Sequence, residues 1–190
     1  MGNKVEFGLN KLYFGTYEVA DNGTVTLGTP VRVPGARKFT PEEASERSTV
    51  DGDDVTYWAG YSGGTEEGDV EVVLFPDTFK ETFLGDARTA DGGLAHVKNA
   101  ERPDVYMMFE VKGDSEKRRV IYYNGSLGSI KREYNTLEDG KKEPATETIP
   151  VTFVGDNATG ITKVTYKPTD SGYDTLFTNP PVPALASDES

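Results

Sequence analysis

Apolar and polar residues alternate along much of this chain with the two-residue period of β-strands. Between residues 105 and 111, Val105, Met107 and Phe109 fall on one side, and Tyr106 and Met108 fall on the other. Residues 69–75 show the same period, with Val70, Val72 and Leu74 on one predicted face. The pattern predicts strands that bury one face or both.

Turn signals separate these strands into hairpins. Asn22-Gly23 joins residues 12–19 to residues 25–33, and this dipeptide is a strong short signal for a tight turn. Gly63, Gly64 and Gly68 predict a further turn between a strand at 55–61 and the strand at 69–75. Other strands are predicted at residues 120–123, 129–137, 146–154 and 161–167. Because Pro150 cannot donate to a ladder, its strand is expected at an edge, or Pro150 at a bulge.

One short helix is predicted after Phe75-Pro76. Asp77 or Thr78 would cap its amino end, and Gly85 fits the position just beyond its carboxyl end. Phe79 and Phe83 stand four residues apart on one helix face, so they are expected to pack the helix on a sheet together with Leu84.

The predicted fold class is therefore mainly β: an antiparallel β-sandwich or flattened barrel with one short flanking helix. Residues 1–168 are expected to form one domain, with a long polar loop at 36–54. Residues 169–190, which contain three prolines, are expected to form an extended or disordered arm. Such a sandwich must cover, charge or share its sheet edges, and sharing them with identical copies makes an oligomer.

Charge is concentrated in one region. The net charge is -12, and between Asp51 and Asp86 ten carboxylates face one cation, Lys80. A sequence pI near 4.6 argues against a groove that grips nucleic-acid phosphates. No apolar run approaches the ~18 residues that span a bilayer, so a protein made in the cytosol and without a membrane partner is expected.

The sequence offers little for catalysis. It has no cysteine and a single histidine, His96, which is expected to be an exposed strand or loop residue. Neither a nucleophile elbow nor a glycine-rich phosphate cradle is present. Asp51, Asp53 and Asp54 could bind calcium, but they do not match an EF-hand loop, and a solvated turn is favoured. No enzymatic activity, cofactor or metal is expected.

Two alternatives remain open at this level. Tyr57, Trp58 and Tyr61 could form a platform that binds carbohydrate or a receptor, although packing between sheets is favoured for them. A hydrolase would need His96, or a carboxylate pair such as Glu66 and Glu71. Neighbouring acids on one turn rarely hold the separation that glycoside hydrolysis requires.

The order of the segments resembles the major tail protein, or tail-tube protein, of long non-contractile-tailed bacteriophages. The segments are a long loop after the first hairpin, residues 54–57 (DVTY), 68–72 (GDVEV), the helix from 75 to 85, 106–110 (YMMFE), 118–124 (RRVIYYN) and 146–148 (TET). The similarity extends to about Lys167, and the order and spacing carry it more than any single motif.

The resemblance implies a structural virion protein of the phage tail, made in the host bacterial cytoplasm. Hexameric rings of such proteins stack into a tube whose lumen conducts phage DNA without binding it specifically. The implied partners are further copies of the chain and the tape-measure, tail-terminator and distal tail proteins. An acidic lumen would repel DNA over roughly a Debye length, about 8 Å at physiological salt.

Specific residues are assigned roles on this hypothesis. The candidate acids of the lumen or ring rim are Glu66, Glu67, Asp69 and Glu71, with a solvated face as the alternative. The candidate contacts between rings, within the loop at 36–54, are Arg37, Phe39, Glu42, Glu43, Arg47 and Asp51. Tyr173 and Phe177 are the candidate anchors of the carboxyl-terminal arm on a neighbouring copy.

Overall fold

The computed structural model describes residues 9–52, 55–111, 113, 116–132 and 145–186, and for 45–52 and 55–62 it describes the backbone alone. This part of the chain contains twelve strands and one helix. Their bounds are β1 Leu9–Val19, β2 Val25–Leu27, β3 Val31–Val33, β4 Ala36–Gly52, β5 Val55–Val72, α1 Asp77–Phe83, β6 Ala87–Arg88, β7 Leu94–Ala95, β8 Val105–Val111, β9 Arg119–Leu127, β10 Lys131–Arg132, β11 Glu147–Phe153 and β12 Lys163–Tyr166.

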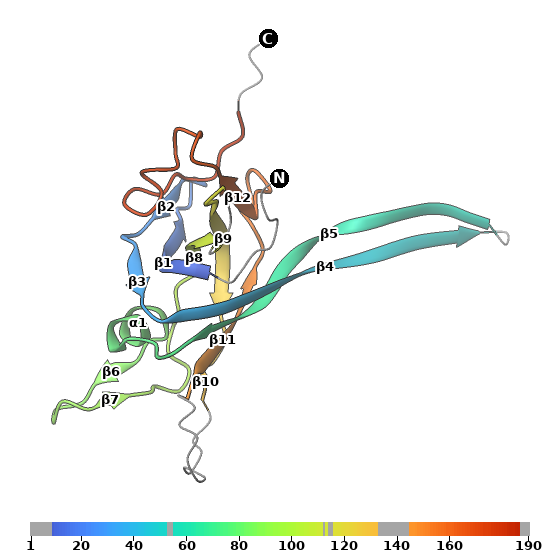
Figure 1. Ribbon diagram of the computed structural model, residues 1–190. Helices are drawn as coiled ribbons and strands as arrows, with labels where there is room; N and C mark the ends of the chain where they lie inside the picture. Colours follow the sequence, from blue (N-terminus) through green and yellow to red (C-terminus); the bar gives the residue numbers. More distant parts are fainter. Residues whose placement is uncertain (1–8, 53–54, 112, 114–115, 133–144, 187–190) are drawn as a thin grey trace, which may run out of the picture.

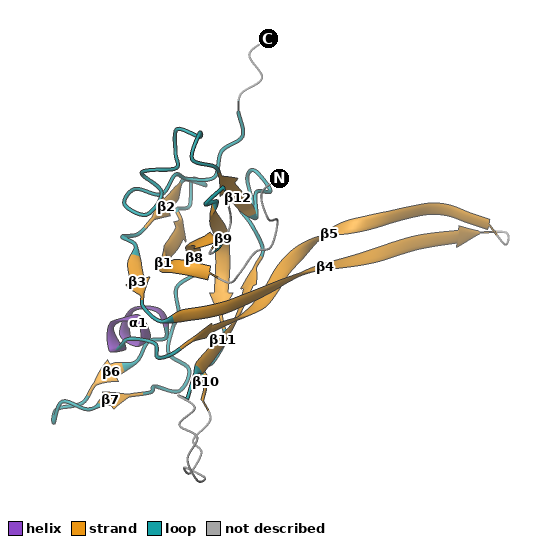
Figure 2. Ribbon diagram, in the orientation of Figure 1, coloured by secondary structure: helices purple, strands orange, loops and turns teal. Residues whose placement is uncertain are grey.

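Ten of these strands form one antiparallel sheet that curls into a flattened sandwich (Figures 1 and 2). Its strand order is β2-β1-β8-β9-β11-β5-β4, with β3 on β1, β10 on β11 and β12 on β9. The strand β9 is shared, because its first half pairs with β12 and its second half with β11. The fold is mainly β, as the sequence predicts.

One face of the sheet packs against the helix. Phe79 and Phe83 are fully buried, and the ring centroid of Phe79 lies 5.1 Å from that of Phe14 on β1. Leu84 is also buried, which confirms the predicted helix packing. The residue before α1 is Pro76, and no side chain caps the helix, so the predicted cap by Asp77 or Thr78 is wrong. The carboxylate of Asp77 instead lies 2.9 Å from Arg88, which tethers the β6–β7 hairpin.

The opposite face is covered by the carboxyl-terminal segment. Tyr106 and Met108 of β8 lie in this second core with Leu176, whereas Val105 and Met107 lie in the first. The alternation predicted for residues 105–111 is therefore confirmed, and β8 is buried on both faces. Of the apolar set on residues 69–75, Val70 and Val72 are buried, but Leu74 lies beyond the end of β5 and is 48% exposed.

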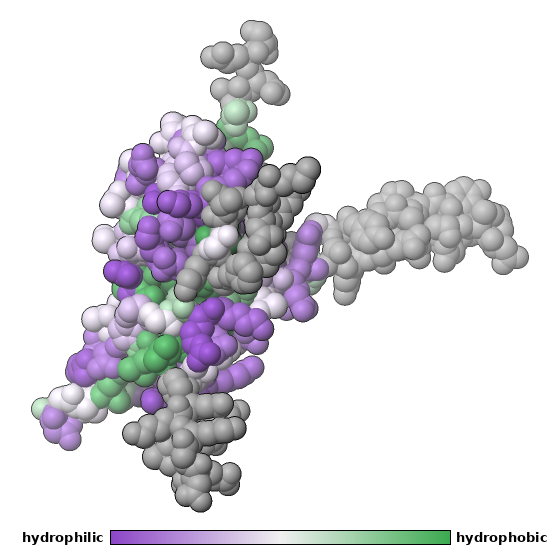
Figure 3. Space-filling model, viewed as in Figure 1, coloured by the Kyte–Doolittle hydropathy of each residue, from purple (hydrophilic) through white to green (hydrophobic). Residues whose placement is uncertain are grey.

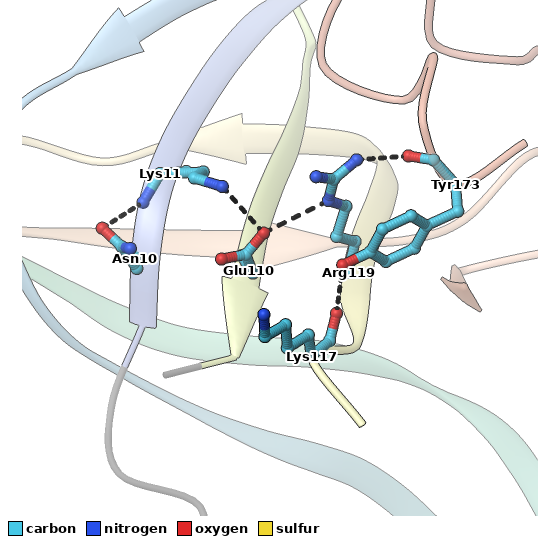
Figure 4. Close-up of polar contacts among 6 residues, drawn as sticks. All are labelled: Asn10, Lys11, Glu110, Lys117, Arg119 and Tyr173. Carbon is cyan, nitrogen blue, oxygen red and sulfur yellow. Dashed lines mark hydrogen bonds and ion pairs between the residues drawn. The ribbon is translucent and has the colours of Figure 1, made fainter. Parts of the chain in front are cut away.

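An ion-pair cluster fixes the carboxyl-terminal segment to this face (Figure 4). Glu110 lies 3.0 Å from Lys11 and 3.3 Å from Arg119. The Arg119 guanidinium stacks 3.9 Å above the Tyr173 ring and donates to the Tyr173 carbonyl, while the Tyr173 hydroxyl donates to the Lys117 carbonyl. Within the described part of the segment, residues 168–179 are thus a run of turns packed on their own chain rather than an extended or disordered arm.

The greatest departure from the sequence prediction is the β4–β5 hairpin, which projects far from the body (Figure 1). Residues 36–52 form a strand, not a loop, and β5 runs without a turn through Gly63, Gly64 and Gly68. Alternation reveals a strand only where one face is buried. Residues 40–44 are all exposed, so their pattern carries no such signal.

Pro150 lies inside the sheet, not at an edge, and its pairing with β5 is regular. The Pro150 carbonyl accepts from the N–H of Gly128, the residue after β9, at 2.8 Å. The proline nitrogen therefore also points toward the β9 side of β11. Pairing with β9 ends at Val151 and pairing with β10 begins at Thr148. The missing N–H therefore falls where β11 changes partners.

Polar residues predominate on the visible face of the body, with apolar residues gathered near α1 (Figure 3). No helix in the described residues is long and apolar enough to cross a bilayer.

Candidate assembly surface

An acidic face covers the outer side of β4, β5 and β11. Strand pairing sets three residues side by side in each row, and directly opposed residues in an antiparallel sheet share a face. The rows of this acidic face are Lys38–Glu71–Thr148, Thr40–Asp69–Pro150 and Glu42–Glu67–Thr152. All nine residues are at least partly exposed.

The acidic face is hollowed into an open groove of about 660 Å³. Five carboxylates line it against one lysine, Lys38. The Arg37 guanidinium lies 3.6 Å from Glu71, so positive charge collects at one end of the groove. Toward Glu42 and Glu67 the face is negative, and it would repel a polyanion at short range.

The structure brings three of the four predicted acids together. Glu67, Asp69 and Glu71 share the acidic face, but Glu66 lies on the opposite face with Val70. Glu66 is 7% exposed, and its carboxylate is 2.7 Å from the ammonium of Lys163 on β12. Glu66 is therefore not a candidate lumen acid. Because β5 continues through residues 63–68 without a turn, the two-residue period places Glu66 on the same face as Val70.

Glu66 also affects the pKa of the neighbouring Tyr122 hydroxyl. Burial raises the pKa of the Tyr122 hydroxyl, and the charge and hydrogen bond of Glu66 raise it further. Tyr122 therefore stays neutral, while the Glu66–Lys163 pair satisfies the charge beside it.

The residues assigned to ring contacts occupy different environments. Phe39 points toward the body and packs against the core as a partly buried residue, with its ring centroid 5.5 Å from that of Tyr122 and 5.9 Å from that of Phe109. Glu42 and Glu43 are exposed and stand opposite Glu67 and Glu66 at the root of the hairpin.

The outer part of the hairpin carries the remaining candidates by backbone position. Arg47 pairs with Tyr61, Val50 with Trp58 and Asp51 with Thr56. The backbone of Tyr57, Trp58 and Tyr61 thus runs in the projecting hairpin, so the packing between sheets that the sequence favoured does not follow from the fold. Asp53 and Asp54 lie outside the described residues.

His96 is exposed, as predicted, and its Nδ1 lies 2.7 Å from the Asp86 carboxylate. Within the described part of the chain, no group of three histidine or acidic side chains could hold a metal ion.

Two buried carboxylates were not singled out from the sequence. Glu147 accepts from the Phe75 N–H at 2.7 Å and lies 3.3 Å from the Lys80 ammonium. Asp156 accepts from the Tyr17 hydroxyl and from Thr159, each at 2.7 Å. Burial works to raise the pKa of Asp156, but these hydrogen bonds outweigh it and lower the pKa. Every partner named here except Thr159 is distant in the sequence, so no local pattern points to these two carboxylates.

No protein-family model matches the chain, and no curated protein matches it. Solved structures show a distant likeness. One is a chain of the PVC sheath–tube complex of an extracellular contractile injection system, in the extended state. Its TM-score is 0.43 and its identity 10%, over 83% of this chain and 88% of that one. Another is a chain of the anti-feeding prophage cap, a tube-terminating cap. Its TM-score is 0.42 and its identity 8%, over 88% of this chain and 95% of that one. Neither is described as part of a long non-contractile phage tail.

Proposed function

We propose that this chain is a non-enzymatic structural subunit that assembles with copies of itself into a tube. The observation that carries the proposal is the β4–β5 hairpin, whose two strands pair with each other as far as Gly52 and Val55. Beyond Ala44, eight residues of β4 at about 3.3 Å each extend the hairpin by roughly 25 Å.

A hairpin of this kind needs a partner. An isolated two-stranded hairpin is marginally stable in water, and unpaired strand edges recruit other strands. Pairing of β5 with β11 ends at Glu66, so both outer edges of the distal hairpin lack a strand partner among the described residues. Contact with another copy would supply one, and contacts that do not close on themselves propagate into a filament.

The acidic face gives the tube a function. If it lines the interior, Glu67, Asp69 and Glu71 keep DNA phosphates from adhering, so that the conduit transports DNA without binding it. Six copies per ring, stacked rings, a long non-contractile phage tail, and the tape-measure, terminator and distal tail proteins as partners are implied by the sequence resemblance and belong to the same proposal.

A truncated hairpin tests this function. Ala44 and Thr65 are paired, so replacing residues 45–64 by Asn-Gly closes the two strands with a tight turn. The truncated chain should still unfold cooperatively in urea yet remain monomeric, while the intact chain forms large species that grow with concentration in sedimentation velocity. An intact chain that stays monomeric up to millimolar concentration would overturn the proposal.

A further inference from the structure

A second groove lies where β4 crosses over β8, β9 and β12, on the face opposite the acidic groove. Its volume is about 420 Å³. Phe39, Phe109 and Tyr122 lie along it, with their ring centroids 5.5 to 6.2 Å apart. The charged residues in its described lining are Arg118 and Lys163. Because Lys163 is already paired with Glu66 at 2.7 Å, the groove suits an uncharged, aromatic-rich segment.

One wall of this groove is β12, which has a strand partner on one side. Its pairing with β9 joins Lys163 to Tyr122 and Thr165 to Val120. The Tyr123 N–H donates to the Thr162 carbonyl at 2.9 Å, so Thr162, Val164 and Tyr166 direct their backbone groups toward β9. Lys163 and Thr165 direct theirs outward, and no described strand pairs with that outer edge.

The distal part of β5 has the complementary properties. Residues 55–62 (VTYWAGYS) carry no charge and three aromatic side chains. Their outer edge continues the edge by which residues 66–72 pair with β11. The facing part of β4 carries Glu46, Arg47 and Asp51, and charges of this kind discourage strand addition at an edge. The β5 edge is therefore the one suited to pairing.

We propose that residues 55–62 of one copy add as a strand to the outer edge of β12 in a second copy. The backbone groups of Lys163 and Thr165 then pair with the added strand, and its side chains enter the aromatic groove. This mode is strand addition, in which backbone pairing supplies affinity and the groove supplies specificity. The inference rests on the proposed self-assembly and names the docking site for the hairpin.

A single outward N–H provides the first test. Thr165→Pro removes it, while the bonds from β12 to β9 use other residues. Thr165→Ala is the matched control, because it trims the same side chain and keeps the N–H. Thr165→Pro should raise the concentration needed for assembly at least tenfold, and Thr165→Ala less than twofold.

Trp58 supplies an independent readout, because it is the one tryptophan in the chain. Its emission should shift to shorter wavelength when the intact chain assembles, and should not shift for Thr165→Pro at the same concentration. If Thr165→Pro folds and assembles like the intact chain, the docking site is wrong and the proposed tube stands. If the intact chain never assembles, the tube itself is wrong.

Engineered cysteines decide the question even if Thr165→Pro fails to fold, since the natural chain has none. Chains carrying Thr165→Cys would be mixed with tagged chains carrying Thr56→Cys, Ala59→Cys or Ser62→Cys under mild oxidation. At least one pair should form a disulfide-linked heterodimer, because disulfides require Cα atoms about 4.4–6.8 Å apart. The exposed control Thr26→Cys on β2 should not. Equal yields with Thr26→Cys, or no heterodimer in any pair, would exclude the docking site.

Discussion

Among single residues, Glu147 should contribute most to the stability of the folded chain. Its side chain is 3% exposed, and it accepts from the Phe75 N–H and faces Lys80 and Arg132. Glu147→Ala leaves the N–H and the largely buried Lys80 without this acceptor. We expect it to lower the free energy of unfolding by about 3–5 kcal/mol in urea titrations.

Glu116→Ala is the control for this prediction. Glu116 and Lys167 form an exposed pair at 3.6 Å, so the change should stay within about 0.5 kcal/mol. A Glu147→Ala chain as stable as Glu116→Ala would show that the carboxylate does not hold the segment before α1 to β11.

Asp156 should make stability depend on pH in acid. Its folded-state pKa is lowered, so its contribution is complete above the unfolded value of about 3.9 and is lost as the pH falls through the lower folded value. Asp156→Asn should cost roughly 1–3 kcal/mol at pH 7. The difference in Tm between the two chains should shrink between pH 5 and pH 2, and a constant difference would contradict the assignment.

At the level of elements, the root of the hairpin places like charges opposite each other. Glu42 faces Glu67, and Glu43 faces Glu66, which Lys163 neutralises on its own face. Opposite charges across a strand pair contribute roughly 0.2–1 kcal/mol. Glu67→Lys should therefore raise the free energy of unfolding by about that amount.

The neighbouring substitution Glu66→Lys should have the opposite effect. It replaces the buried partner of Lys163 by a second ammonium, and should destabilise by about 1–3 kcal/mol in the same denaturation series. If both changes act in the same direction, the assignment of Glu66 and Glu67 to opposite faces is wrong.

The sequence predicts the packed elements and fails on the projecting one. The helix with Phe79 and Phe83, and the alternation in β8, follow from burial against a core, which imposes a period on the residues. The hairpin is outside the body and obeys no such period, so residues 36–52 looked like a loop. The grouping of Glu66 with the other acids followed from the mistaken turn at 63–68. The structure places Glu67, Asp69 and Glu71 on one sheet face, and their place in a lumen stays a prediction.

For the whole molecule, the acidic face should govern the behaviour of DNA. Reversing Glu67, Asp69 and Glu71 to Lys should make assembled tubes retain duplex DNA in co-sedimentation, with retention that falls steeply as salt rises. The control carries the same charge change at exposed positions elsewhere: Glu18→Lys, Glu101→Lys and Asp174→Lys. Equal retention by both variants would mean that net charge matters and the acidic face does not line the conduit.

Electron micrographs of the negatively stained intact chain, over rising concentration and beside the hairpin-truncated chain, test the central claim most directly. Copies that share strand edges should appear as rings and hollow tubes with a stain-filled channel, and the truncated chain should give single particles. Discrete monomers of the intact chain at every concentration, or tubes formed equally well without residues 45–64, would contradict it.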